Sequence, residues 1–156
     1  MLGRFSGPLA LTLLFAATGI AQSVPLALSI RATHDSFKSG SDVEIQATLT
    51  NLSDEPISCP KMSPVWAFDY DVWDTDGNPV LETQQFDDWK HPKPGGYASG
   101  GGSRIKARRD AMVYIPIGEY FNMSRPGTYF IRVRRRPDRL MGEYIESNVI
   151  EIKVGQ

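Results

Sequence analysis

The sequence predicts an all-β protein built as a β-sandwich, and three observations favour this fold class. Apolar residues alternate with polar ones over short stretches, which is the period of a strand with one buried face. Turn residues separate these stretches, and no segment carries a sustained apolar repeat at helical spacing. In the clearest stretch, residues 125–133, a Pro-Gly turn leads into an alternating strand that begins near Tyr129. Such a turn and strand are typical of a central strand of a sandwich.

The remaining elements are antiparallel strands joined by turns. Val43 to Leu49 alternates cleanly after a Ser-Gly-Ser turn at residues 39–41, and a stretch that starts at Trp66 is followed by an Asp-Gly-Asn turn at residues 76–78. Turns of this composition tolerate positive φ and connect hairpins. We expect about seven strands, covering residues 26–30, 43–49, 66–73, 79–83, 104–116, 128–136 and 145–154.

The first residues indicate export. One positive charge at Arg4 precedes an almost wholly apolar run from Pro8 to Ala16, and small residues precede Gln22. This is the pattern of a signal peptide, expected over residues 1–21. The apolar run is shorter than the roughly 20 residues of a membrane span, so we expect cleavage, a periplasmic or extracellular protein and no membrane span afterwards.

Residues 22–156 are long enough for a single domain with its own core. The chain has one cysteine, Cys59, so this domain has no internal disulfide and depends on apolar burial. We expect Cys59 to be buried and inert at a strand end. A reactive thiol would need a basic partner and an activating environment.

Charge is nearly balanced overall but unevenly placed. The chain has 17 Lys and Arg against 18 Asp and Glu, for a net charge of −1. Acidic residues carry all the charge from Trp66 to Asp88, and basic residues concentrate between Arg104 and Arg139. A basic cluster can bind nucleic acid. Export and the neighbouring acidic stretch instead favour pairing between strands, so we expect no nucleic-acid partner.

The stretches at residues 43–53, 126–129 and 147–148 together resemble the Ig-like domains of exported bacterial proteins. This resemblance covers most of residues 22–156 and implies an Ig-like sandwich. Tyr129 would then be the corner tyrosine, and Ile131 would replace the second cysteine of the usual disulfide. By packing against Ile45 or Ala47, Ile131 would do what the disulfide does elsewhere, and Trp66 or Phe68 would fill the centre of the core.

Residues 51–77 are also similar to the intracellular proteinase inhibitor family, whose domain is a comparable sandwich. The chain departs from that family in its export signal and in its long glycine-rich insertion, and it carries no residues that define an inhibitory loop. The resemblance therefore implies a fold more than a function.

The candidate chemical motifs do not support catalysis or a resident metal. The acidic residues from Asp69 to Asp76 lack EF-hand spacing, leaving a weak calcium site at the turn as an alternative. His34 and His91 are too few and too isolated for zinc. No Gly-x-Ser-x-Gly elbow is present, and the glycines at 95–102 lack the lysine of a phosphate loop. We expect no enzyme activity, no metal and no cofactor.

Two surfaces are candidates for binding. The first is a long loop, residues 86–103, in which Trp89, His91 and Tyr97 lie among Gly and Pro. Aromatic residues in such a frame are typical of adaptable recognition loops. A tether or a tolerated insertion is the alternative.

The second candidate surface is the outer face of the sheet that contains residues 66–73 and 128–136. Alternation places Trp73, Phe130, Arg132 and Arg134 outward, and these residue types are enriched at interfaces. The alternative is purely local, with Asp69 and Asp71 pairing with the arginines across the strands.

The leading functional hypothesis is an exported, non-enzymatic Ig-like module that binds a protein or a cell-envelope component. A secreted proteinase inhibitor is the alternative, and a small hydrolase is the third. An inhibition assay against serine proteases separates the first two. A convergent Ser, His and carboxylate cluster would favour the third.

Overall fold

The computed structural model describes residues 25–59, 63–92, 102–135 and 144–155. The expected signal peptide, residues 1–21, lies outside the described residues. Antiparallel strands dominate the described part of the chain, as the sequence predicts. No helix in the described ranges is long and apolar enough to cross a membrane.

The first sheet contains β1 (Leu26–Ala32), β2 (Ile45–Asn51) and β6 (Asp110–Ile115), in the order β1-β2-β6. Both pairings are antiparallel. The β2 strand is central, and its alternating residues Ile45 and Leu49 are fully buried. The alternation that predicts this strand therefore reports a true core face.

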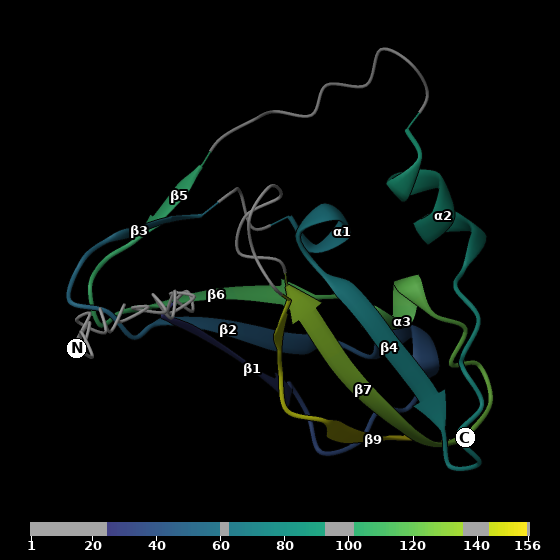
Figure 1. Ribbon diagram of the computed structural model, residues 1–156. Coiled ribbons are helices and arrows are strands. Elements are labelled where there is room, and N and C mark those ends of the chain that lie inside the picture. The colour runs from purple at the N-terminus through teal and green to yellow at the C-terminus, as the bar shows by residue number, and fades with distance from the viewer. Residues whose placement is uncertain (1–24, 60–62, 93–101, 136–143, 156) are drawn as a thin grey trace, which may run out of the picture.

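The second sheet is centred on β7 (Gly127–Arg135). One edge of β7 pairs with β4 (Asp69–Asp74), and the other pairs with β9 (Ile150–Val154) and, further along, with the short β8 (Ile145–Glu146). In Figure 1, β4 and β7 run at an angle to the strands of the first sheet. Both sheets contribute side chains to one buried cluster, so the fold is sandwich-like.

The inward face of β7 has the register that the sequence predicts. Tyr129, Ile131 and Val133 are buried, with Ile131 and Val133 fully so. The hydroxyl group of Tyr129 donates a hydrogen bond to the backbone carbonyl of Arg125 at 2.7 Å. This bond ties the start of β7 to the turn that precedes it.

Short elements complete the fold. A two-stranded ribbon joins β3 (Ile57–Cys59) to β5 (Ser103–Ile105). The helical segments are η1 (Gly40–Asp42), α1 (Pro64–Ala67), α2 (Gln84–Lys90) and α3 (Ile117–Tyr120). Figure 1 places α1, α2 and α3 along one side of β4.

The structure corrects three expectations: the strand at residues 66–73, the strand at residues 79–83 and the loop at residues 86–103. The strand predicted from Trp66 begins only at Asp69, because α1 starts at Pro64, whose fixed φ suits the first position of a helix. Trp66 is therefore 50% exposed and does not fill the core, whereas Phe68 is buried. The segment 79–83 makes only isolated bridges, through Pro79 and Glu82, and is not a strand.

The third correction concerns the predicted loop at residues 86–103, which begins as a helix. The hydroxyl oxygen of Thr83 accepts a hydrogen bond from the backbone N–H of Phe86 and caps α2. Asp87 in the first turn and Lys90 in the last turn suit the helix dipole. Only Phe86 is buried, so α2 lacks the apolar repeat that would have predicted it.

Cys59 is buried at the end of β3, as predicted. Burial raises the pKa of its thiol, and the neighbouring Arg135 partly opposes this change. A raised thiol pKa lowers the thiolate fraction and so disfavours nucleophilic chemistry.

Candidate functional site

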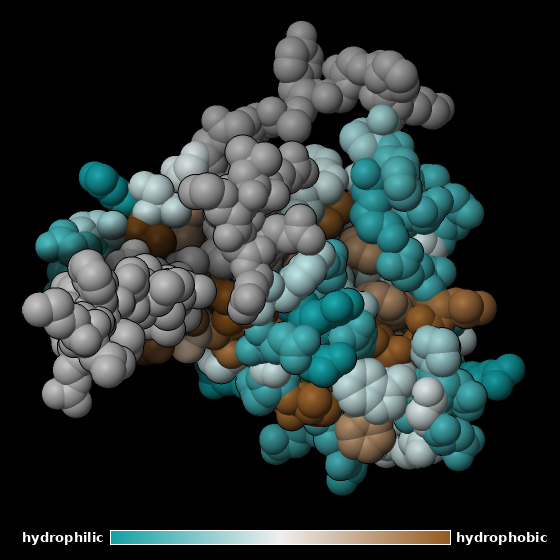
Figure 2. Space-filling view, in the orientation of Figure 1, coloured by the Kyte–Doolittle hydropathy of each residue, from teal (hydrophilic) through white to brown (hydrophobic). Residues whose placement is uncertain are grey.

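A groove of about 390 Å³ lies where α1, α2 and β4 meet, which is a volume typical of small-molecule sites. We call it the aromatic groove. Aromatic and charged side chains from distant parts of the chain line it together: Trp66, Phe68, Tyr70 and Phe86, with Asp69, Glu82, Lys90 and Arg134. In Figure 2 the outer surface of α2 is hydrophilic and hydrophobic residues are visible at its base.

The inner wall of the aromatic groove is a packed aromatic cluster. Phe86 stacks on Tyr120 with the ring centroids 4.3 Å apart and the planes within 6°. Tyr70 meets both rings edge to face, at 6.0 Å from Phe86 and 5.7 Å from Tyr120. Such aromatic pairs add stability beyond the apolar area that they bury. This wall therefore packs α2 against β4 through the contact of Phe86 with Tyr70.

Burial of this wall changes the acidity of its two tyrosines. Burial raises the pKa of Tyr70 well above its ordinary value of 10.0, and the neighbouring Tyr120 and Asp69 add to the shift. Burial also raises the pKa of Tyr120 to about 12, with a further contribution from Glu119. Both phenols are therefore neutral at physiological pH. The hydroxyl group of Tyr70 donates a hydrogen bond to the backbone carbonyl of Pro64 and so anchors α1.

Trp66 is the exposed aromatic member of the groove. Trp66 is 50% exposed. It lies in α1, whose first residue, Pro64, accepts a hydrogen bond from the hydroxyl group of Tyr70. Exposing a large indole costs hydrophobic free energy, so an exposed indole beside a concave surface often marks a contact.

The two basic residues of the groove, Lys90 and Arg134, are paired with acidic partners. Lys90 forms an ion pair with Glu82, and its amine lies 4.9 Å from the centre of the Phe86 ring. Arg134 bonds to Asp71 at 3.0 Å, and its guanidinium lies 5.4 Å from the centre of the Tyr144 ring. These contacts fix the positions of Lys90 and Arg134 at the groove.

The predicted outer surface is a strip of side chains across β4 and β7 that contact one another. We call it the outer strip: Asp71, Trp73, Phe130, Arg132 and Arg134. Register places Asp71 opposite Arg132 and Trp73 opposite Phe130. Asp71 accepts hydrogen bonds from Arg132 at 2.9 Å and from Arg134 at 3.0 Å, and Arg132 also reaches Glu146 at 3.4 Å. The rings of Trp73 and Phe130 stack at 6.0 Å.

These contacts match the local alternative that the sequence left open, in which acidic residues of one strand pair with arginines of the next. One detail differs. Arg134 lies opposite Asp69 in the register but donates to Asp71, so a single carboxylate holds both arginines. Asp71, together with Glu146 beside the strip, therefore pairs with the charges of Arg132 and Arg134, although Nε of Arg134 is buried without a hydrogen-bond partner among the described residues.

The residues predicted for the loop surface separate in the structure. Trp89 lies on α2, 36% exposed, and meets Tyr120 edge to face at 5.8 Å. His91 ends α2 and its ring lies 3.3 Å from the carboxylate of Asp87. Tyr97 lies outside the described residues. Trp89 therefore lies on α2, the helix that borders the groove. His91 lies at the C-terminal end of this helix, beside Asp87.

The aromatic groove joins parts of both predicted surfaces. Arg134 belongs to the outer strip and also lines the groove, whereas Trp73, Phe130 and Arg132 do not line it. The sequence alone did not place Trp66 and Phe86 in the groove. The Ser-Pro start of α1 and the Thr83 cap of α2 were the signals that could have found them.

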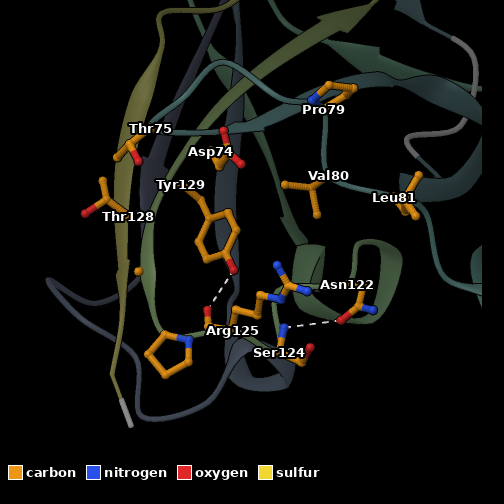
Figure 3. A pocket seen from close by; sticks show the side chains of 12 residues that line it. Asp74, Thr75, Pro79, Val80, Leu81, Asn122, Ser124, Arg125, Thr128 and Tyr129 are labelled. Carbon is orange, nitrogen blue, oxygen red and sulfur yellow. Dashed lines mark hydrogen bonds between the residues drawn. The ribbon is translucent and has the colours of Figure 1, made fainter.

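A second pocket, of about 410 Å³, lies at the corner before β7 (Figure 3). Figure 3 shows the side chain of Arg125 crossing it towards Val80 and Asn122. The carboxylate of Asp74, also at this pocket, accepts hydrogen bonds from the backbone N–H groups of Asp76 and Asn78. The bond from the Asn78 backbone is the largest cause of the lowered pKa of Asp74.

The acidic turn at residues 74–78 was the alternative calcium site. The Asp74 carboxylate is engaged by the turn itself, through the two backbone bonds and the side-chain amide of Asn78 at 3.2 Å. Within the described ranges, no group of three or more His, Cys, Asp or Glu side chains is placed to hold a metal ion.

No family model and no curated protein matches the chain. The aromatic groove therefore has to be interpreted from its own chemistry. It combines a packed aromatic wall, an exposed indole and two basic groups that already have acidic partners, which is an arrangement suited to recognition.

Proposed function

We propose that the chain is an exported, non-enzymatic binding module that contacts a protein or a cell-envelope component through the aromatic groove. The leader-like residues 1–21 support export to the periplasm or to the outside of the cell. The observation that carries the proposal is the groove itself, where a half-exposed Trp66 lies beside an aromatic wall built from β4, α2 and α3.

An Ig-like sandwich is the architecture that we propose for this module. The strand orders β1-β2-β6 and β4-β7-β9 correspond to the A-B-E and C-F-G orders of immunoglobulin-type sheets. The hydrogen bond from Tyr129 to Arg125 is what a corner tyrosine at the start of strand F would make. In this architecture, α1 belongs to the connection that leads into strand C and α2 to the connection that follows it, and binding residues commonly lie in such connections.

A retention experiment with matched variants tests the proposed function. The protein starting at Gln22 is immobilised and exposed to the envelope fraction of its source cells, alongside Trp66→Ala and Tyr114→Ala. Tyr114 is an aromatic control, 57% exposed on the first sheet and remote in sequence from the groove. We expect the same material to be retained by the wild type and by Tyr114→Ala and to be lost from Trp66→Ala.

Two results would contradict this function. Equal retention by all three proteins would show that Trp66 and the groove do not bind the retained material. Stoichiometric inhibition of a serine protease by the wild-type protein would favour the secreted proteinase inhibitor instead.

A further inference from the structure

We infer that the aromatic groove recognises an uncharged carbohydrate, and this inference rests on the proposed binding function. A sugar ring has one face of C–H groups and a rim of hydroxyl groups. Such a ligand needs an exposed aromatic surface for its face and fixed donors and acceptors for its rim. The groove supplies both within one concave surface.

The aromatic surface is Trp66. Its indole is half exposed while the other aromatic side chains of the groove are more buried. An indole offers a large, flat, apolar area with only two rotatable bonds, so stacking on it loses little conformational entropy. The helix that carries Trp66 is held by the hydrogen bond from Tyr70 to Pro64. The surface is therefore formed before a ligand arrives, which lowers the cost of binding.

The polar groups suit hydroxyl groups. Lys90 and Arg134 are donors, and Asp69 and Glu82 are acceptors. Lys90 and Arg134 are each already held by an acidic partner, and an ammonium group or a guanidinium group has further N–H donors beyond one such bond. These donors lie in fixed positions along the groove.

The charge balance argues against a charged ligand. Among the described residues that line the groove, Asp69 and Glu82 are acidic and Lys90 and Arg134 are basic, so these four give no excess of either sign. A phosphate or carboxylate ligand would have to compete with Glu82 and Asp71 for the same cations. A cationic ligand would meet Lys90 already above the ring of Phe86. A neutral ligand with many hydroxyl groups leaves both ion pairs in place.

Titration of tryptophan fluorescence with neutral cello-, malto- and chito-oligosaccharides tests this inference. We expect a saturable change with at least one series, because a sugar on Trp66 shields its indole from water. Trp66→Ala should weaken the binding by about tenfold or more, the equivalent of one lost aromatic stack, and Trp66→Phe should restore part of it. Calorimetry gives the affinities independently of the fluorophore.

A control variant and a salt series make the test specific. Trp73→Ala also removes one tryptophan, but from the stacked pair of the outer strip, and it should leave the affinity unchanged. Raising the ionic strength should also leave it unchanged, because screening weakens only interactions between charges.

Three outcomes would overturn the inference. They are no saturable response to any of the three series, equal affinity for wild type and Trp66→Ala, or an affinity that falls steeply with salt. If the envelope experiment retains a protein through Trp66 while every neutral sugar fails to bind, the binding function stands and the carbohydrate inference is wrong. If nothing from the envelope is retained but a sugar binds through Trp66, the envelope partner is wrong and the sugar site stands.

Discussion

The outer strip and the aromatic groove share Arg134, yet they differ in how far their aromatic side chains are covered by neighbours. In the outer strip, one carboxylate holds two arginines and two aromatic rings stack on each other. In the groove, charged groups are paired along the walls while Trp66 remains half exposed. Both surfaces contain the aromatic and basic residues typical of interfaces.

This difference shows that residue type alone does not identify a binding surface. Cross-strand neighbours in a regular ladder lie close enough to satisfy one another, so a strip of Trp, Phe, Arg and Asp can stabilise itself. Where short helices pack against the edge of a sheet, the same residue types meet at irregular angles. A concave surface then remains open to a ligand.

Loss of the shared core should have the largest effect, because both surfaces depend on β7. Ile131 is fully buried at the centre of this strand, so Ile131→Ala should lower the free energy of unfolding by about 2–5 kcal/mol. Thr128→Ala, in the same strand but only partly buried, should change it little. Chemical denaturation measures both. Equal, small losses would contradict the inward register of β7.

A change at Gly118 should disturb the groove more than the outer strip. A Cβ atom at this position of α3 would lie 1.9 Å from the carbonyl oxygen of Gly40, so the two backbones would have to separate. We expect Gly118→Ala to destabilise the protein by about 1–3 kcal/mol or more. It should also displace Tyr120, which stacks on Phe86 in the groove wall.

Gly127→Ala is the matched control for this substitution, since a Cβ there meets nothing within 4 Å. Near-ultraviolet circular dichroism reports the aromatic wall, and denaturation reports stability. If Gly127→Ala costs as much as Gly118→Ala, the close approach of α3 and η1 is not the cause.

Removal of Asp71 should have a smaller effect, on the outer strip and on Arg134 where the strip borders the groove. Asp71→Ala breaks the pairs with Arg132 and Arg134, each worth about 0.2–1 kcal/mol for partly exposed groups. High salt should reduce the difference from wild type, because screening already weakens these pairs. A salt-independent loss would show that Asp71 acts through packing.

The last expected effect is limited to alkaline pH and originates in the groove wall. The pKa of Tyr120 is about 12 in the folded protein and 10.0 ordinarily, so its contribution is complete below pH 10.0 and is lost as the pH rises through about 12. Tyr120→Phe keeps the ring but should flatten this part of the stability profile. An unchanged slope would assign the loss to other groups, such as Tyr70.

Alternation predicted the buried faces of β2, β7 and β9 because the environment of these strands repeats along the chain. The predicted strand at residues 104–116 is instead divided between β5 and β6, which lie in different sheets. In β7 and β9 every second side chain meets the core, as in Ile131 and Ile152, so the sequence alone defines the buried face. Cys59 was likewise predicted as buried. The pairing of Asp71 with arginines followed from the same alternation, as the local alternative for the outer face.

The groove could not be predicted in this way. Trp66, Phe86 and Arg134 are far apart in the sequence, and only the packing of α1 and α2 against β4 brings them together. The helices are too short for a helical repeat, and their caps at Ser63 and Thr83 were the only local signals. Apolar and polar residues alternate from Trp66 onwards, which predicts a strand that begins there. In the structure the short helix α1 includes Trp66, so the strand begins only at Asp69.

The most direct test of the account compares two tryptophans, Trp66 in the groove and Trp73 in the outer strip. The retained envelope component is titrated against the wild type, Trp66→Ala and Trp73→Ala under identical conditions, after denaturation has confirmed that all three are folded. We predict that Trp66→Ala loses about tenfold or more in affinity and that Trp73→Ala binds as the wild type does. Loss of binding in Trp73→Ala with full binding in Trp66→Ala would contradict the account and assign recognition to the outer strip.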